Sequence, residues 1–175
     1  DLELTDVGRE RAKLAAETLG DLELDNPLVI SSPMQRALQT AELAGLSVNE
    51  MSPLLQEWDY GDFEGLTTPQ IRETVPDWLI WTHGAEGGES IAAVTERADA
   101  AVALALEHMV TRDVLFVGHG HFSRAVITRW VELPLPSGIR FGMAAASIAV
   151  LGFEHGVRQI IALGLTGHTD PCKPR

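Results

Sequence analysis

The sequence predicts an α/β fold, a three-layer α/β/α sandwich in which a mostly parallel sheet carries an antiparallel edge hairpin. Short apolar runs alternate with longer helix-like segments along most of the chain, the pattern of strand–helix–strand units. Near the end of the chain, two apolar runs at 147–154 and 157–164 flank His155-Gly156, a pair typical of a tight hairpin turn.

Helices are expected where apolar residues recur with helical spacing after a capping residue. Thr5 is suited to cap the first helix, Pro33 fits the first turn of the second, and Ser90 or Glu89 opens a long alanine-rich helix. In chain order, the expected helices cover residues 6–19, 33–44, 68–75, 77–82, 91–109 and 122–131.

Strands are expected where short apolar runs stop at turn residues. The runs 27–32 (PLVISS) and 113–119 (DVLFVGH) are apolar enough for buried strands. Residues 47–51 predict a shorter strand with Val48 and Met51 directed inward. Together with the two hairpin strands, these segments form the predicted sheet.

The composition fits one domain with one core. The chain has 175 residues, of which 45% are hydrophobic, and no apolar stretch is long enough to cross a membrane. The net charge of −12 argues against nucleic acid as a partner, because no basic stripe is present to neutralise phosphates. The single Cys172 excludes an internal disulfide and a cysteine zinc site. A cytoplasmic location is expected.

Two polar segments directly follow predicted parallel strands. SSPMQRA comes after 27–32, and GHGHFSRA comes after the apolar part of 113–119. Ligands of open α/β sheets bind beyond the carboxyl ends of the strands, so this topology brings Arg36 and His119 toward one cleft. A planar guanidinium can bind phosphate in a bidentate way, although an arginine early in a helix is ordinarily exposed.

Three interpretations compete for His119-Gly120-His121: a metal site, a phosphate site, or ordinary surface histidines. Gly120 lets a ligand approach the backbone, and the helix start that follows offers N–H groups to an oxyanion. A zinc site needs a third ligand, and no His-Glu-x-x-His pattern is present. These observations favour phosphate at His119 and no metal, with a packing or solvent role for His121.

The segment EWDYGDFEG combines carboxylates with aromatic residues. Most such clusters are solvated loops, but a carboxyl buried beside an aromatic ring would have a raised pKa and could act as a general acid. The residue pattern leaves four candidates open: Glu57, Asp59, Asp62 and Glu64.

Five motifs in the same order resemble the histidine phosphatase superfamily, which includes cofactor-dependent phosphoglycerate mutases and acid phosphatases. They are LTDVGRERA, SSPMQRALQTAE, EWDYGDFEG, GGES and VGHGHFSRA. The resemblance extends from Leu4 to about Ala125, and it is closest to the short, phosphatase-type members of the family.

The resemblance implies a mechanism and assigns residues to it. A histidine in an Arg-His-Gly motif attacks phosphorus, and water then hydrolyses the phosphohistidine. His119 matches the second histidine, which binds the transferring phosphoryl group, together with Arg36 and the Gly120 backbone. Glu57 matches the proton donor to the leaving oxygen. The positive charge comes from protein groups, so neither a metal nor another cofactor is implied.

In the family, the Arg-His-Gly strand lies upstream of the motif at which this sequence starts. The 175 residues are therefore expected to be one N-terminally incomplete domain that is inactive alone. The absent strand would lie in the centre of the sheet, between the strands at 113–119 and 147–154. Those two strands should not pair with each other.

The segment between the acidic loop and GGES distinguishes a phosphatase from a mutase. Residues 66–87 offer only Arg72 to grip a second phosphate, which favours a phosphomonoester hydrolase acting on a small phosphorylated substrate. A phosphoglycerate mutase-type phosphotransferase and a non-catalytic phospholigand-binding module are the alternatives. A small lid is expected around 57–90, and Tyr60, His83 and His121 are candidates for the substrate pocket. Assembly as a homodimer is left open beside a monomer.

Overall fold

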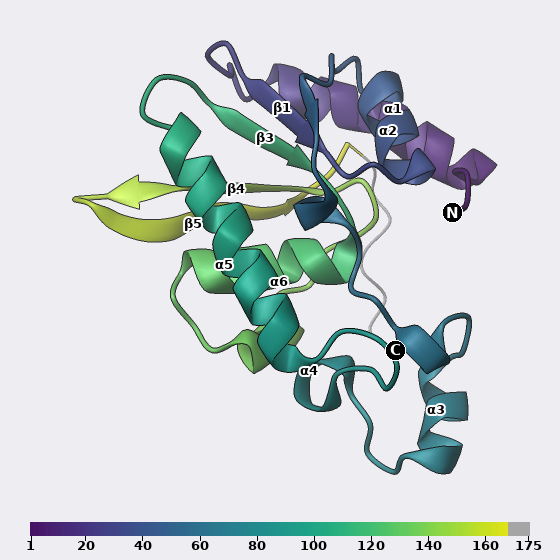
Figure 1. Cartoon of the computed structure of the whole chain (residues 1–175). Coiled ribbons are helices and arrows are strands. Elements are labelled where there is room, and N and C mark those ends of the chain that lie inside the picture. Colours follow the sequence, from purple (N-terminus) through teal and green to yellow (C-terminus); the bar gives the residue numbers. More distant parts are fainter. Residues whose placement is uncertain (168–175) are drawn as a thin grey trace.

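Strands and helices alternate along the chain before a final hairpin, as the computed structural model of residues 1–167 shows (Figure 1). The helices are α1 (Asp6–Gly20), α2 (Gln35–Leu43), α3 (Thr68–Thr74), α4 (Ile80–His83), α5 (Ile91–His108) and α6 (Gly120–Trp130). Three short 3-10 helices are η1 (Pro53–Leu55), η2 (Gly61–Phe63) and η3 (Leu135–Arg140). The strands are β1 (Leu28–Ser31), β2 (Glu50–Met51), β3 (Val114–Val117), β4 (Ile148–Glu154) and β5 (Val157–Leu165).

The parallel sheet has the strand order β2-β1-β3. Strands β1 and β3 align along their whole length and end together, with Ser31 opposite Val117. The backbone N–H of Ser32 continues this pairing by donating to the carbonyl of Val117 at 2.8 Å. The segments that follow the two strands therefore leave the sheet side by side.

The hairpin β4–β5 forms a sheet of its own. Its turn lies at His155 (φ 50°) and Gly156 (φ 83°), and the two strands pair antiparallel. The α/β fold with a parallel sheet and an antiparallel hairpin is as expected, and in the part of the chain that the structure describes β4 is bonded to β5 and not to β3. This separation confirms the expectation that β3 and β4 do not pair directly.

Side chains of α6 hold the hairpin in place. Trp130 packs edge-to-face against Phe153 with ring centroids 5.2 Å apart, and its indole N–H donates to the carbonyl of Gln159 at 3.1 Å. These two contacts attach the hairpin to α6, and within residues 1–167 its strands pair only with each other.

Helix pairs flank the strands. Helices α1 and α2 pack together on one side, whereas α5 and α6 pack together on the other (Figure 1). The inward stripe of α5 is made of small residues, which lets neighbouring elements approach closely: Val94, Ala98, Ala101, Val102 and Ala105.

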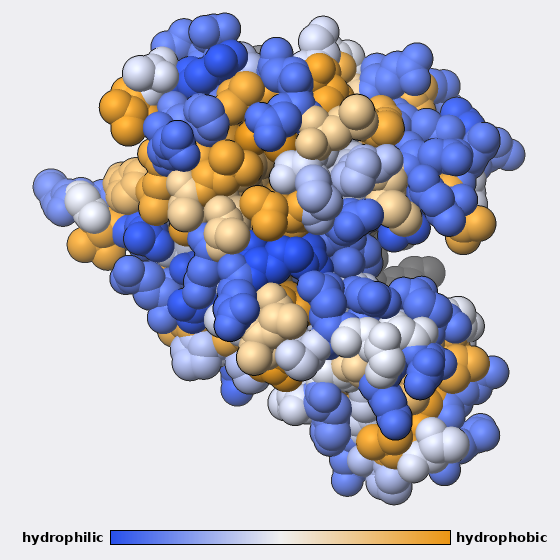
Figure 2. Space-filling view, viewed as in Figure 1, coloured by the Kyte–Doolittle hydropathy of each residue, from blue (hydrophilic) through white to orange (hydrophobic). Residues whose placement is uncertain are grey.

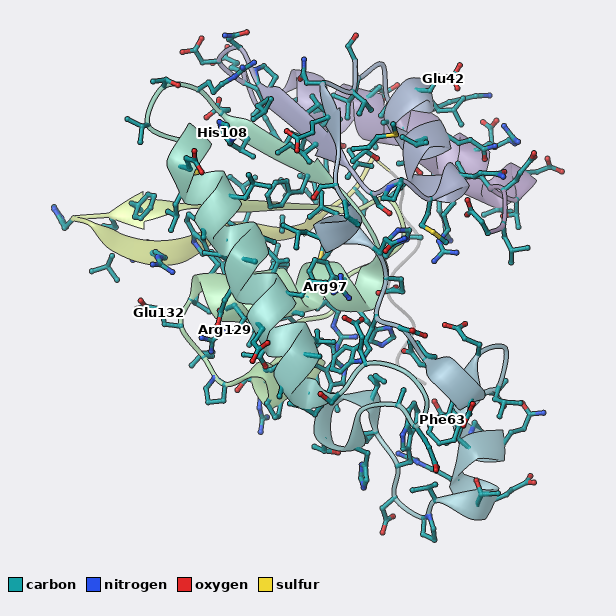
Figure 3. The ribbon with its side chains drawn as sticks, in the orientation of Figure 1. Glu42, Phe63, Arg97, His108, Arg129 and Glu132 are labelled. Carbon is teal, nitrogen blue, oxygen red and sulfur yellow. The ribbon has the colours of Figure 1, made fainter. Side chains whose placement is uncertain are left out.

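The segment 57–90 projects from this body as an arm that carries η2, α3 and α4, at the lower right of Figure 1. An edge-to-face contact between Phe63 and Trp78, with ring centroids 5.5 Å apart, supports the arm, and Figure 3 labels Phe63 within it. Figure 2 shows a notch between the arm and the part of the surface that α1 and α2 form.

Two predicted elements differ from the structure. Met51 was expected to point inward but is 59% exposed, because β2 is a two-residue edge strand that pairs only with β1 in residues 1–167. The helix expected over 77–82 is a single turn that starts at Ile80. Asp77 has a left-handed backbone (φ 60°), which a helix cannot include. No helix within residues 1–167 has the length and apolar character needed to span a membrane.

We expect Gly138→Ala to lower the free energy of unfolding by about 2 kcal/mol or more. A Cβ at Gly138 would overlap the buried Trp81 ring and lie 2.9 Å from Thr128 Oγ1. Chemical denaturation of the full-length protein measures the effect. Gly142→Ala is the matched control, because a Cβ there would have no neighbour within 4 Å. Equal stability of both variants would contradict the close packing of η3.

Candidate active site

The ends of β1 and β3 bring Arg36 and His119 together. Arg36, in the first turn of α2, donates from Nε to Nδ1 of His119 at 3.1 Å. The other ring nitrogen, Nε2, lies 2.8 Å from the hydroxyl oxygen of Ser32. Because Nδ1 accepts from the guanidinium, Nε2 carries the proton and donates to Ser32. The two strand ends thus bring Arg36 and His119 together, as the sequence predicts, although only Arg36 of the two lines the cleft described below.

His119 is buried and neutral. Only 6% of the residue is exposed, and burial lowers its pKa to about 4. Burial is the largest cause of this pKa value; the charges of Arg36 and Arg97 contribute to the lowering, whereas the charge of Glu57 opposes it. At neutral pH the ring is therefore an uncharged hydrogen-bond donor through Nε2, in a site whose positive charge comes from arginine.

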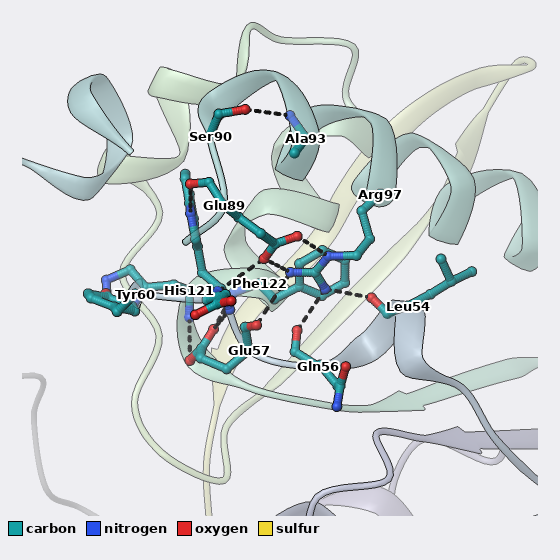
Figure 4. Close-up of polar contacts among 12 residues, drawn as sticks. Leu54, Gln56, Glu57, Tyr60, Glu89, Ser90, Ala93, Arg97, His121 and Phe122 are labelled. Carbon is teal, nitrogen blue, oxygen red and sulfur yellow. Dashed lines mark hydrogen bonds and ion pairs between the residues drawn. The ribbon is translucent and has the colours of Figure 1, made fainter. Parts of the chain in front are cut away.

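The carboxylate of Glu57 is bound at the start of α6. Its Oε1 accepts from the backbone N–H groups of Trp58 at 3.0 Å and Phe122 at 2.9 Å, and its Oε2 accepts from the N–H of His121 at 3.3 Å (Figure 4). Gly120, the first residue of α6, is exposed and lies in the chain between His119 and the two backbone N–H groups of α6 that bind Glu57. A carboxylate and a buried histidine therefore meet at one helix N-terminus, where the macrodipole favours negative charge.

Tyr60 and His121 form a polar pair beside the carboxylate. The Tyr60 hydroxyl lies 3.0 Å from Nδ1 of His121, and the two rings meet edge-to-face (Figure 4). Burial raises the pKa of Tyr60, with the charges of Glu57 and Glu64 in support. Burial also disfavours the charged form of His121 and so lowers its pKa; the charge of Arg124 contributes to this lowering. Both side chains are consequently neutral at neutral pH, and His121 packs against the rings of Tyr60 and Trp81, as expected, while also contacting the Tyr60 hydroxyl.

The site opens into a cleft of about 1320 Å³ between the sheet edge and the arm. Aromatic side chains form much of its wall, among them Trp58, Tyr60, Phe63, Trp78 and Trp81. Its charged lining residues are Asp1, Arg36, Glu57, Asp59, Glu64, Arg72 and Arg124.

The structure keeps His83 outside this cleft. The residue is exposed at the end of α4, where its Nδ1 contacts the Leu79 backbone and the Thr82 hydroxyl. The helical turn that begins at Ile80 directs it away from the lining. Among His, Cys, Asp and Glu of residues 1–167, no group of three or more is arranged to hold a metal ion.

Sequence reasoning missed Ser32, Glu89 and Arg97. Ser32 is fully buried against His119, and the Arg97–Glu89 pair lies behind Glu57. The position of Arg97 in the sequence could have indicated a buried role. It follows Val94 by three residues, which places it beside the inward stripe of an alanine-rich helix. A charged residue at such a position needs buried partners.

The family model of the histidine phosphatase superfamily (branch 1) matches residues 1–166. The chain belongs to the histidine phosphatase superfamily. Curated members of the superfamily to which this chain is similar are named as phosphatases, consistent with phosphomonoester hydrolysis.

Two curated members of the superfamily illustrate the relationship. An acid phosphatase of Mycobacterium tuberculosis is 68% identical over 171 residues, which cover 98% of this chain and 84% of that protein. A glucosyl-3-phosphoglycerate phosphatase of the same species is 35% identical over 152 residues, covering 77% of this chain and 67% of that protein.

Solved structures of the superfamily have the same fold. The structure of the product of a Mycobacterium tuberculosis open reading frame is 70% identical, with a TM-score of 0.93 over 95% of this chain and 86% of that chain. A mycobacterial glucosyl-3-phosphoglycerate phosphatase in complex with inorganic phosphate is 29% identical, with a TM-score of 0.77 over 94% of this chain and 88% of that chain.

We expect the free energy of unfolding to fall as the pH falls from about 7 to about 4 in phosphate-free buffer. The pKa of His119 is about 4 in the folded protein against 6.5 ordinarily, so the unfolded chain takes up this proton first. The difference between the two pKa values contributes up to about 3 kcal/mol to the free energy of unfolding. This contribution is fully present only above pH 6.5 and is lost as the pH falls toward 4.

Chemical denaturation over this pH range, with His119→Gln as the variant, measures the effect. The variant should lose this part of the pH dependence. The control His155→Asn, on the exposed hairpin turn, should retain it. An unchanged slope in His119→Gln would contradict a buried neutral histidine.

Proposed function

We propose that the full-length protein is a metal-independent acid phosphatase that hydrolyses small phosphomonoesters through a phosphohistidine. The contact between Arg36 and His119 at the strand ends, beside the carboxylate of Glu57, carries this proposal. Phosphoryl transfer requires donors around the phosphoryl oxygens and a proton for the leaving oxygen, and these residues supply both.

Each residue has a separate role in the proposed reaction. Arg36 donates from its terminal nitrogens to the phosphoryl oxygens, while its Nε holds His119. The Nε2–H of His119 turns from Ser32 to a phosphoryl oxygen, and the exposed Gly120 backbone lets that oxygen approach the start of α6. Glu57 protonates the ester oxygen as the P–O bond breaks, and the resulting carboxylate then accepts a proton from the water that hydrolyses the phosphohistidine.

The attacking histidine is proposed to come from a further strand between β3 and β4. In residues 1–167, β3 is bonded to β1 alone and β4 to β5 alone, so each has an unpaired edge with which such a strand can form hydrogen bonds. Within the same residues, both ring nitrogens of His119 contact Arg36 and Ser32. A chain of these 175 residues is then inactive by itself.

The cleft favours a phosphatase over a mutase. A mutase must hold a second phosphate, whereas Arg72 is occupied with the carbonyl of Trp78 and Arg124 with the carbonyl of Gly138. Carboxylates also line the cleft beyond the proposed phosphate position, among them Asp59 and Glu64. A second anion is therefore poorly accommodated, and the phosphoenzyme transfers its group to water.

The arm at 57–90 forms one wall of the cleft, and we propose that it serves as the lid over the substrate. Tyr60 and His121 then contact the leaving group. A cytoplasmic location and assembly as a homodimer stay predictions, which fractionation and analytical ultracentrifugation measure.

We expect Glu57→Gln to lower kcat for alkyl phosphates on the order of 10²-fold or more, and for p-nitrophenyl phosphate far less. An alkoxide needs a proton in the transition state, whereas nitrophenolate leaves without one. Steady-state kinetics of the full-length protein with both substrates test this.

Glu64→Gln and Asp59→Asn are the matched controls from the same loop, and neither should show a dependence on the leaving group. Equal losses of the Glu57 variant with both substrates would show that another group is the donor. Phosphate binding with no turnover of any ester would favour the binding-module alternative.

We expect full activity of the full-length protein after exhaustive treatment with EDTA. The arginine charge and the N–H donor of neutral His119 stabilise the phosphoryl oxygens, so removal of divalent ions should change kcat by less than about twofold. Turnover of p-nitrophenyl phosphate in metal-free buffer measures this. Loss of activity that zinc restores would contradict the proposed chemistry.

A further inference from the structure

Arg97 is the most fully bonded side chain near the site. It projects inward from α5 (Figure 3), and its side chain is 15% exposed. Nε and Nη2 donate to the two carboxylate oxygens of Glu89 at 2.7 and 2.6 Å. Nη1 donates to the carbonyls of Leu54 and Gln56, each at 2.8 Å, and Nη2 also donates to the carbonyl of Glu57 at 3.4 Å (Figure 4). These acceptors use all the N–H groups of the guanidinium.

Arg97 holds Glu57 from two directions. Its three carbonyl contacts fix the short backbone segment that ends at Glu57. Its guanidinium also lies 3.8 Å above the ring of Phe122. Phe122 in turn donates its backbone N–H to Oε1 of Glu57. One side chain thus fixes both the backbone of the carboxylate and the residue that binds its oxygen.

Glu89 holds the other side of the same loop. Its Oε2 accepts from the backbone N–H of Asp59 at 3.0 Å, and its own N–H donates to the Asp59 carbonyl at 3.0 Å. The indole N–H of Trp58 donates to the Glu89 carbonyl at 3.1 Å. The ion pair of Glu89 with Arg97 therefore brackets Glu57 between two restrained backbone segments.

Neither member of the pair lines the cleft, and every N–H group of Arg97 is already bonded to a protein acceptor, so we assign the pair no contact with the substrate. We propose that the Arg97–Glu89 pair is a positioning device that sets the angle and distance at which Glu57 delivers its proton to the leaving oxygen. This inference rests on the proposed function of Glu57 as the proton donor.

The proton-transfer step defines what the pair must control. The P–O bond to the leaving group breaks while the proton moves from a Glu57 oxygen to the ester oxygen, which leaves a carboxylate on Glu57 and an alcohol as product. A small displacement of the carboxyl group slows this transfer but leaves phosphoryl binding by Arg36 and His119 intact.

The test measures kcat and KM of the full-length protein for a series of phosphate esters with increasingly basic leaving groups. Arg97→Gln should lower kcat for alkyl phosphates by about 10- to 100-fold. For p-nitrophenyl phosphate the loss should stay within about threefold, with KM unchanged for both. In the Glu57→Gln background, Arg97→Gln should add no further sensitivity to the leaving group.

Two milder variants keep the test decisive if Arg97→Gln does not fold. Arg97→Lys retains the charge but cannot reach five acceptors, so it should show the same selective loss to a smaller extent. Glu89→Gln keeps the shape of the acceptor and should also give a smaller selective loss. Both are compared at equal folded fraction by circular dichroism.

Arg129→Gln is the matched control. Arg129 lies on α6, away from Arg97 (Figure 3), and forms a similar ion pair with Asp99 at 2.6 Å and a hydrogen bond to the Leu133 carbonyl at 2.8 Å. Its loss should reduce stability without any dependence of kcat on the leaving group.

The outcomes separate the two proposals. Equal losses for aryl and alkyl phosphates in the Arg97 variants, or no loss in either, would overturn the positioning role while Glu57→Gln remains selective. If Glu57→Gln itself shows no selectivity, the assignment of Glu57 as donor fails first. A selective loss in both sets, absent from Arg129→Gln, supports the positioning role.

Discussion

The site depends on the parallel pairing of β1 with β3. The two strands end in register, so the chain leaves both at the same edge and enters two helices beside each other. Ser32 and Arg36 come from the first exit, and His119 and Gly120 come from the second. A shift of this register would separate the guanidinium from the imidazole, because each side chain has only a few ångströms of reach.

The second constraint on the chemistry is that His119 is buried and uncharged. His119 is buried, and the charges of Arg36 and Arg97 further disfavour its protonation. It therefore stays neutral and donates from Nε2, the ring nitrogen that does not contact Arg36. The negative charge of Glu57 faces the start of α6, where backbone N–H groups satisfy its oxygens. Charges of both signs are thus placed close together, and each is satisfied by hydrogen bonds instead of by bulk water.

The arm determines what can approach this arrangement. Its aromatic side chains, with Tyr60 paired to His121 of α6, give the cleft an uncharged wall, and Asp59 and Glu64 add negative charge to the lining. The Arg97–Glu89 pair connects the arm to α5 through the loop that carries Glu57. The proposed substrate lid and the proposed proton donor therefore share one structural support.

Local patterns in the sequence were sufficient for the helices at 6–20 and 91–108, for strands β1 and β3 and for the hairpin turn, because spacing, caps and turn residues act over a few positions. Of the two strands expected to be buried, β1 is buried and β3 is only partly buried. The rule that ligands bind beyond parallel strand ends also predicted the meeting of Arg36 with His119. The residue pattern left four carboxylates open, and only the family resemblance pointed to Glu57; tertiary structure decided that Glu57 reaches the start of α6 and where Arg97 finds its carbonyl partners. Those outcomes depend on contacts across 30 or more residues, and no short-range pattern specifies them. The outward direction of His83 instead follows from contacts within its own helical turn.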